Sequence, residues 1–194
     1  MKVSKLLAVI SIIVLSAGLS QAQVYLGVQG GVGFSSFEDQ DKGASAVPLG
    51  ITIGTDLMPI IDIGAEANFL ASPYKFEEID PFTMETTESK FSQNFYGAYV
   101  RWYVLPLPAI TPYLRGGVAY YSGKWSNGGD VDMKGSVGFN IGAGVDFLMG
   151  LYGEVVYHIV SLEPDMENLP DEFAGSKGYN SVQVTVGYSF DLLF

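Results

Sequence analysis

The sequence predicts an all-β fold, a closed barrel of eight antiparallel strands in up-and-down order. Apolar and polar residues alternate over long stretches, which gives each expected strand one apolar face. The connections between these stretches alternate between long and short. Charged residues of the strands lie opposite the apolar face, so the apolar face is the outside of the barrel and suits a lipid bilayer. The predicted barrel is therefore a transmembrane one.

The first 22 residues are expected to be a cleaved signal peptide. Lys2 and Lys5 precede an apolar run over residues 6–15, and a small, polar region ends at Ala22. The apolar run is shorter than the roughly 20 residues that a membrane-spanning helix needs. The mature domain is then predicted to cover residues 23–194.

The composition excludes several classes of protein. The chain has no cysteine, so it has neither disulfides nor thiolate metal sites. Removal of Lys2 and Lys5 with the leader lowers the formal charge from -11 to -13, which argues against a nucleic-acid partner. The 24 glycines and the 12 Tyr and 12 Phe residues favour extended structure, since glycine weakens helices and aromatic residues favour strands.

The first three strands are predicted over 23–37, 47–57 and 61–71. Their apolar, outward-facing residues are Val24, Leu26, Val28, Val32, Phe34, Leu49, Ile51, Ile53, Leu57, Ile61, Ile63, Ala65, Ala67 and Phe69. The first link, 38–46, is long and acidic, whereas the second, 58–60, is a tight connection that contains a proline. The tight connection predicts that the second and third strands form a hairpin.

The fourth and fifth strands are predicted over 91–105 and 113–121, after a long acidic link over 72–90. The fourth strand is aromatic on both faces. We assign Tyr96, Ala98, Val100, Trp102 and Val104 to its outer face, mainly because this directs Arg101 inward. The link 106–112 contains three prolines, which cannot donate to a β-ladder.

The last three strands are predicted over 135–147, 151–162 and 182–194. A turn around Met149 and Gly150 joins the first two, and long links over 122–134 and 163–178 flank them. The final strand reads VQVTVGYSFDLLF, in which every second residue is apolar back from Phe194. An apolar strand of this length avoids a free edge when it pairs with the first strand, which closes the barrel.

Nine inward-facing residues are predicted to form a charge network in the lumen. They are Asp56, Asp62, Glu66, Arg101, Arg115, Asp146, Glu154, His158 and Asp191. Most of them lie close to a short connection, so they are expected at one end of the interior. Eight strands leave an interior that side chains fill, and buried charges persist when they are paired. The network is therefore expected to plug the barrel.

The C-terminal strand resembles the assembly signal of bacterial outer-membrane β-barrels, with Gly187, Phe190, Leu192 and a terminal Phe194. The mature chain as a whole resembles the small eight-stranded outer-membrane barrels of the OmpA/OmpX type, often called porin-like. The resemblance implies a Gram-negative outer membrane, contact with its lipid and insertion by the barrel assembly machinery through the last strand.

Three functions remain open at this stage. The first is a non-enzymatic membrane protein with a plugged interior and four acidic loops for surface contacts. The second is a narrow channel for ions or small solutes, and the third is a lipid-modifying barrel enzyme. His158 and Ser161 are three residues apart, so a strand directs them to opposite faces, which disfavours a catalytic pair. No catalytic, cofactor-binding or metal-binding residue is predicted, although the acidic loops leave room for weak bridging by divalent cations.

Overall fold

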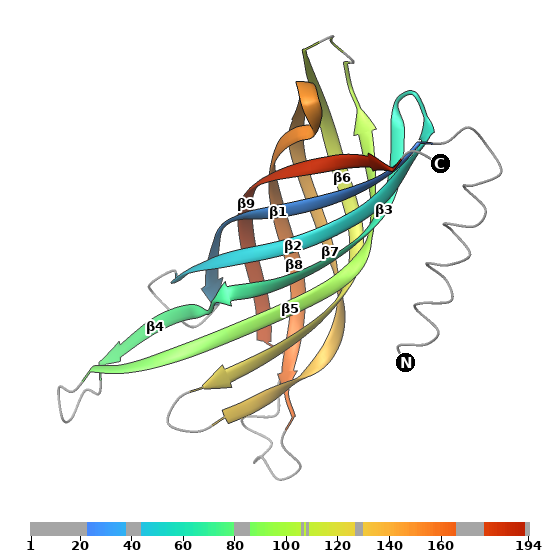
Figure 1. Cartoon of the computed structure of the whole chain (residues 1–194). Helices are drawn as coiled ribbons and strands as arrows, with labels where there is room; N and C mark the ends of the chain where they lie inside the picture. Colours follow the sequence, from blue (N-terminus) through green and yellow to red (C-terminus); the bar gives the residue numbers. More distant parts are fainter. Residues whose placement is uncertain are drawn as a thin grey trace.

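The computed structural model describes residues 23–37, 44–79, 86–105, 107, 109–126, 130–165 and 177–192. These residues form an antiparallel β-barrel (Figure 1). Its strands are β1 Val24–Phe37, β2 Ala44–Met58, β3 Ile61–Ser72, β4 Tyr74–Ile79, β5 Thr86–Tyr103, β6 Ile110–Ser126, β7 Asp130–Phe147, β8 Leu151–Pro164 and β9 Lys177–Leu192. None of the helices in these ranges is both long enough and apolar enough to cross a membrane.

The barrel closes as predicted, by pairing of its first and last strands. β1 pairs with β9 from Val24 opposite Leu192 to Phe37 opposite Tyr179. β3 pairs with β5, and β4 continues the path of β3 beyond Pro73 and pairs with the other part of β5. Since a proline cannot donate to the ladder, Pro73 interrupts what is otherwise one strand. The nine segments therefore make a barrel of eight strands.

The outer face of the barrel is apolar. Val137, Phe139 and Ile141 on β7 expose 62%, 65% and 62% of their surface, and the other strands show the same alternation. β5 directs Val100 outward and buries Arg101. Such an outer surface is stable in the hydrocarbon of a bilayer and would be unfavourable in water.

Most strands are longer than predicted, and they extend at the end of the barrel away from the short connections. β2 begins at Ala44, β7 at Asp130 and β9 at Lys177. The predicted link 72–90 contains β4 and the start of β5, so its description as a polar loop was wrong. The described inward residues of these segments are still buried, as Tyr74, Phe76 and Ser89 show, whereas outward residues such as Lys75 and Lys90 are polar and exposed.

The prediction of a long link over 122–134 was also wrong. β6 continues to Ser126 and β7 starts at Asp130, which leaves three residues, 127–129, between the two strands. The two ends of the barrel therefore differ less in loop length than in how far the paired strands extend. We call the end with the connections 59–60, 104–109 and 148–150 the turn end, and the opposite end the hairpin end.

The connection Leu148–Gly150 at the turn end is a single 3-10 turn. Met149 and Gly150 both have positive φ, 69° and 82°. A β-carbon on Gly150 would lie 2.3 Å from the backbone oxygen of Ser189, so only glycine fits there. This turn holds β7 and β8 in register and thereby fixes the height of their inward side chains.

The interior has two layers. An aromatic cluster fills the hairpin end, with Tyr74, Phe76, Phe91, Phe95, Tyr121 and Tyr179 among its buried members. The charged residues that the sequence analysis identified lie toward the turn end. The candidate site is this charged layer.

Candidate functional site in the barrel interior

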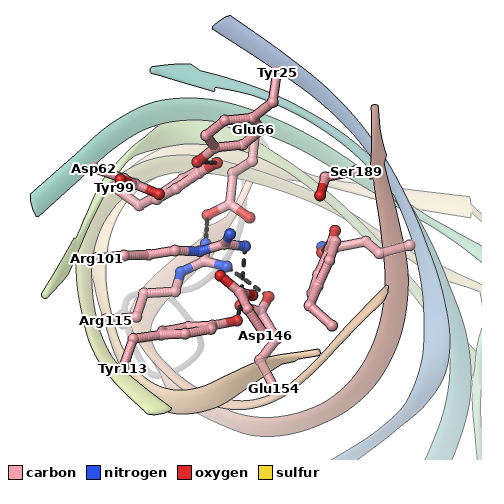
Figure 2. Close-up of polar contacts among 12 residues, drawn as sticks. Tyr25, Asp62, Glu66, Tyr99, Arg101, Tyr113, Arg115, Asp146, Glu154 and Ser189 are labelled. Carbon is pink, nitrogen blue, oxygen red and sulfur yellow. Dashed lines mark hydrogen bonds and ion pairs between the residues drawn. The ribbon is translucent and has the colours of Figure 1, made fainter. Parts of the chain in front are cut away.

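Arg115 is the centre of the charged layer. It lies on β6 and its guanidinium contacts two carboxylates, Glu66 on β3 and Glu154 on β8 (Figure 2). The Nη1 to Oε1 distance to Glu154 is 2.6 Å, and Nη2 pairs directly with Oε1 of Glu66. The Tyr113 hydroxyl donates to the other oxygen of Glu154 over 3.1 Å. These contacts join three strands that are not neighbours in the barrel, so the network crosses the lumen.

Arg101 lies directly opposite Arg115 across the β5–β6 ladder. Two like charges in such a pair repel, and the surroundings offset this repulsion in two ways. Arg101 Nη2 is 3.6 Å from Oε2 of Glu154, so both arginines share one carboxylate. The Arg101 guanidinium carbon also lies 5.2, 4.8 and 5.0 Å from the ring centroids of Tyr99, Tyr113 and Tyr152. The faces of tyrosine rings attract cations at this range.

A chain of neutral hydrogen bonds completes the shell of Glu66. The Asn68 amide donates to Oε2 of Glu66 over 3.1 Å, and Gln29 donates to Asn68 over 3.1 Å. Tyr152 in turn donates to Gln29 over 3.0 Å. Both oxygens of Glu66 are therefore occupied, as expected for a buried carboxylate that stays in place.

Four tyrosines of this layer each lie over a glycine of the neighbouring strand. The pairs, all directly opposite in the ladder, are Tyr25 with Gly54, Tyr99 with Gly64, Tyr113 with Gly144 and Tyr152 with Gly187. A β-carbon at any of these glycines would lie within 2.5 Å of the ring. The glycines thus let the rings lie flat against the wall, where they surround the two arginines.

A second polar group lies nearer the turn end. The Tyr103 hydroxyl is 2.5 Å from Oδ2 of Asp62 and 2.9 Å from Oδ2 of Asp146. Asp62 is buried and lies opposite Arg101 in the β3–β5 register. Tyr103 therefore links the carboxylates of β3 and β7 across the interior.

The structure brings six of the nine predicted charged residues into these two groups: Asp62, Glu66, Arg101, Arg115, Asp146 and Glu154. Asp56 and Asp191 are exposed instead. Asp56 lies opposite Asp62 near the end of β2, and Asp191 lies one residue from the end of β9. Their position in the alternation fits the inner face, but the strands end there and the side chains meet solvent.

His158 belongs to a different level, toward the hairpin end. Its Nδ1 is 2.9 Å from the Tyr121 hydroxyl and its ring lies 4.8 Å from that of Phe95. Ser161 is exposed on the outer face of β8, whereas His158 is 1% exposed. Within the described residues, no three His, Asp or Glu side chains are arranged to hold a metal ion. The geometry here is that of a hydrogen-bonded wall and not of a nucleophile with its base.

The sequence analysis missed the uncharged half of the network. Tyr25, Tyr99, Tyr103, Tyr113 and Tyr152 supply rings and hydroxyls, and Gln29 and Asn68 supply amides. The signal was available, since Tyr113 and Tyr152 occupy the same face as Arg115 and Glu154 in the alternation. Tyrosine occurs on both the lipid-facing and the inward face of a strand, however. The alternation alone therefore does not predict that an inward tyrosine contacts a charged side chain.

Comparison with known proteins agrees with this architecture. The family model for the outer membrane protein beta-barrel domain matches residues 6–190. The crystal structure of Neisserial surface protein A is similar over 89% of this chain and 100% of that chain, with 14% identity and a TM-score of 0.66. The outer membrane protein OprG from Pseudomonas aeruginosa is similar over 87% and 96%, with 13% identity and a TM-score of 0.55. No protein of curated function shows significant sequence similarity to this chain.

Proposed function

This chain belongs to the outer membrane protein beta-barrel domain family, and from this premise we propose that it is a non-enzymatic integral protein with a closed interior. Its exposed hairpins and loops would make contacts at the cell surface. The outer membrane is where the family and the apolar outer wall place it. In such barrels the short turns are periplasmic and the longer extensions are extracellular, so the hairpin end faces outward.

One observation carries the proposal of a closed interior. Arg115 is 3% exposed and is held from two sides by Glu66 and Glu154. Breaking such a buried pair leaves an unpaired charge, which costs about 3–5 kcal/mol. A side chain held in this way does not leave the lumen spontaneously, and an eight-stranded barrel has no room for a path beside it.

Surface contact is supported by the hairpin end. β4 with β5, and β6 with β7, extend there as paired ribbons beyond the apolar band of the wall. The segments 38–46, 72–90, 122–134 and 163–178, which include strand ends as well as links, carry formal charges of -2, -3, 0 and -4. The name of Neisserial surface protein A refers to the cell surface as well. We propose that these acidic segments also bind divalent cations weakly.

Assembly through the last strand is part of the same proposal. Gly187, Phe190 and Leu192 lie on β9, which closes the barrel against β1, and Phe190 is exposed on the outer wall. Phe194 lies outside the described residues. We propose that the barrel assembly machinery recognises this strand before it pairs with β1.

A narrow channel is the second candidate, and it too has an observation in its favour. On the hairpin-end side of the charged layer, Asn140, His158 and Ser181 follow one another across β7, β8 and β9, and each has a buried polar atom that makes no hydrogen bond of good geometry within the described residues. Buried polar atoms of this kind usually contact water. If this level of the lumen held water, it would connect with the turn end when the Arg115 pairs opened.

Conductance of the purified protein in planar bilayers decides between the two candidates. A closed interior predicts no steps above the baseline for the wild-type protein and measurable steps for Arg115→Ala, which removes the bulk at the constriction. Steady single-channel conductance of the wild-type protein would instead support the channel. Activity of the wild-type protein on lipid A or phospholipid would contradict the non-enzymatic proposal.

A further inference from the structure

A tyrosine hydroxyl at the turn end of the lumen contacts two carboxyl groups at once. The Tyr103 oxygen lies 2.5 Å from Oδ2 of Asp62 on β3 and 2.9 Å from Oδ2 of Asp146 on β7. Figure 2 shows both carboxyl groups pointing into the lumen. Tyr103 is held in place, because its backbone amide donates to Ile60 over 2.9 Å and its ring lies 5.8 Å from that of Tyr113. The three side chains therefore make one fixed contact across the mouth of the lumen.

A count of protons shows that this contact needs a protonated carboxyl group. A neutral tyrosine has one hydroxyl proton, and hydrogen bonds weaken steeply at angles below about 120°, so this proton serves one carboxylate. The other contact brings a lone pair of the phenol oxygen to hydrogen-bond distance from a carboxyl oxygen. It is a hydrogen bond only when that carboxyl group carries a proton and donates it to Tyr103. The group therefore holds one proton on the phenol and one on a carboxyl group.

The charges in the lumen favour the same count. Glu66 and Glu154 form the ion pairs with the two arginines, and among the described residues no ion pair reaches Asp62 or Asp146. Asp62 also lies opposite Asp56 in the β2–β3 ladder, where like charges are unfavourable. Two neighbouring carboxyl groups without a basic partner are costly to ionise together, and one retained proton removes this cost.

Titratable and charged groups surround the pair on each of the other strands near it. They are Tyr25 on β1, Asp56 on β2, Arg101 on β5, Tyr113 on β6, Tyr152 and Glu154 on β8, and Asp191 on β9. Arg101 is the basic group of this set, and it lies opposite Asp62 in the β3–β5 ladder while it contacts Glu154. One positive charge nearby favours one ionised carboxylate, so the pair keeps one negative charge and one proton.

We propose that Asp62, Tyr103 and Asp146 form a proton-binding clamp that ties β3 to β7 at the turn end. One carboxyl group donates its proton to the phenol oxygen, and the phenol donates to the other carboxylate. Tyr103 and Asp146 are half-buried, so the carboxyl proton can exchange with solvent. In alkaline solution this proton passes to water and the tyrosine keeps its own, which leaves the phenol bound to one of two ionised carboxylates. The inference needs the closed barrel alone and does not depend on the function proposed above.

Infrared spectroscopy of the purified barrel, in a detergent without carbonyl groups, tests the shared proton. A protonated carboxyl group has a carbonyl band that an ionised one lacks, so the wild-type protein should show this band at neutral pH and lose it at alkaline pH. Asp62→Asn and Asp146→Asn should each lack the band, because the remaining carboxylate accepts the tyrosine proton. Asp132→Asn makes the same change at an exposed position of β7 and should keep the band. A heat-dependent gel shift verifies that each variant is folded.

The pH dependence of stability is a second measurement of the same proton. Unfolding releases it, because an aspartate in an unfolded chain is ionised above about pH 4. Stability should therefore fall as the pH rises. Between about pH 5 and pH 7, the equilibrium constant for urea unfolding of the wild-type protein should rise about tenfold more per pH unit than that of Asp146→Asn. Asp132→Asn should keep the wild-type slope.

Three results would overturn the proposal. Absence of the carboxylic acid band from the wild-type protein at neutral pH would show that both carboxylates are ionised and share the tyrosine proton. This measurement needs no variant, so it stands even where a substitution prevents folding. Bands of equal strength in the wild-type protein and in both lumenal variants would assign the proton to other carboxyl groups. Equal slopes of stability against pH in the wild-type protein and Asp146→Asn would show that the folded state holds no extra proton here.

Discussion

The ring of Tyr152 lies across Gly187, its direct partner in the β8–β9 ladder, where a β-carbon would be 2.3 Å from the ring. The same residue donates to Gln29 and offers its ring to Arg101. Because Gly187 has no side chain, the ring of Tyr152 can lie against the neighbouring strand. In this position the ring helps to hold the Arg101 guanidinium in the lumen. Glycine at position 187 is therefore needed to make room for the Tyr152 ring, whether or not it also takes part in assembly.

We therefore predict that Gly187→Ala and Gly144→Ala each destabilise the folded barrel. The added methyl group displaces the ring of Tyr152 or Tyr113, and such overpacking costs about 1–3 kcal/mol. Urea unfolding in lipid vesicles measures the change. Gly116→Ala is the control, because a β-carbon at Gly116 has nothing within 4 Å. Equal stability of Gly116→Ala and Gly144→Ala would show that the rings do not depend on the glycines.

Alternation in the sequence was enough to predict which face of a strand enters the lumen, except for the fourth predicted strand, where the inward direction of Arg101 decided it. Arg115, Glu66 and Glu154 could be assigned to the interior because their neighbours in the chain are apolar and face lipid. Alternation gives the face of a residue but not its depth, which explains why Asp56 and Asp191 meet solvent. It also does not give contacts across the lumen, since these depend on the stagger of strands far apart in the chain.

The strand ends were predicted less well, for a physical reason. We ended each strand where its outer face became polar, at residues such as Lys90 and Lys124. That change marks the end of the hydrocarbon layer and not the end of hydrogen bonding, because Phe91 and Trp125 continue the inner face and lie opposite each other. In a membrane barrel the end of the hydrocarbon layer and the end of the β-ladder are separate boundaries. The outer face of a strand indicates the first, and only its inner face indicates the second.

The proposed orientation in the membrane leads to a labelling prediction. Asp165 lies just beyond β8 at the hairpin end and Ala109 just before β6 at the turn end, and both are exposed. The chain has no cysteine of its own, so single cysteines can be introduced at each. On intact cells, an impermeant maleimide should label Asp165→Cys and not Ala109→Cys, and both should react after lysis. Labelling of Ala109→Cys alone would reverse the orientation.

The C-terminal residue leads to a prediction about assembly. If the terminal aromatic is part of the signal read by the assembly machinery, Phe194→Ala should lower the folded, membrane-inserted fraction, seen as a weaker heat-modifiable band in outer-membrane preparations. Leu193→Ala removes an apolar side chain from the adjacent position in the sequence, and it should assemble normally. Wild-type levels of Phe194→Ala in the outer membrane would contradict this reading of the strand.

The last prediction concerns the proposed plug. Arg115→Ala leaves Glu66 and Glu154 buried with fewer partners, so we expect a loss of about 3–5 kcal/mol in the free energy of unfolding, measured by urea in lipid. Lys124→Ala removes an exposed side chain of β6 and should change it by no more than about 0.5 kcal/mol. The two variants carry the same change of charge, on the same strand.

A double variant separates the charge of the plug from its packing. If a stranded carboxylate causes the loss, then Arg115→Ala/Glu66→Gln should be more stable than Arg115→Ala, because Glu66 loses its ion pair with Arg115 whereas Glu154 still lies 3.6 Å from Arg101. If lost packing around the guanidinium were the cause, the second substitution would lower the free energy of unfolding further. Single-channel recording of the same proteins should show that conductance appears in both variants without Arg115, because each lacks the side chain that spans from β6 to β3 and β8. Identical stability of Arg115→Ala and Lys124→Ala would contradict the inward network and the facing of β6 on which it depends.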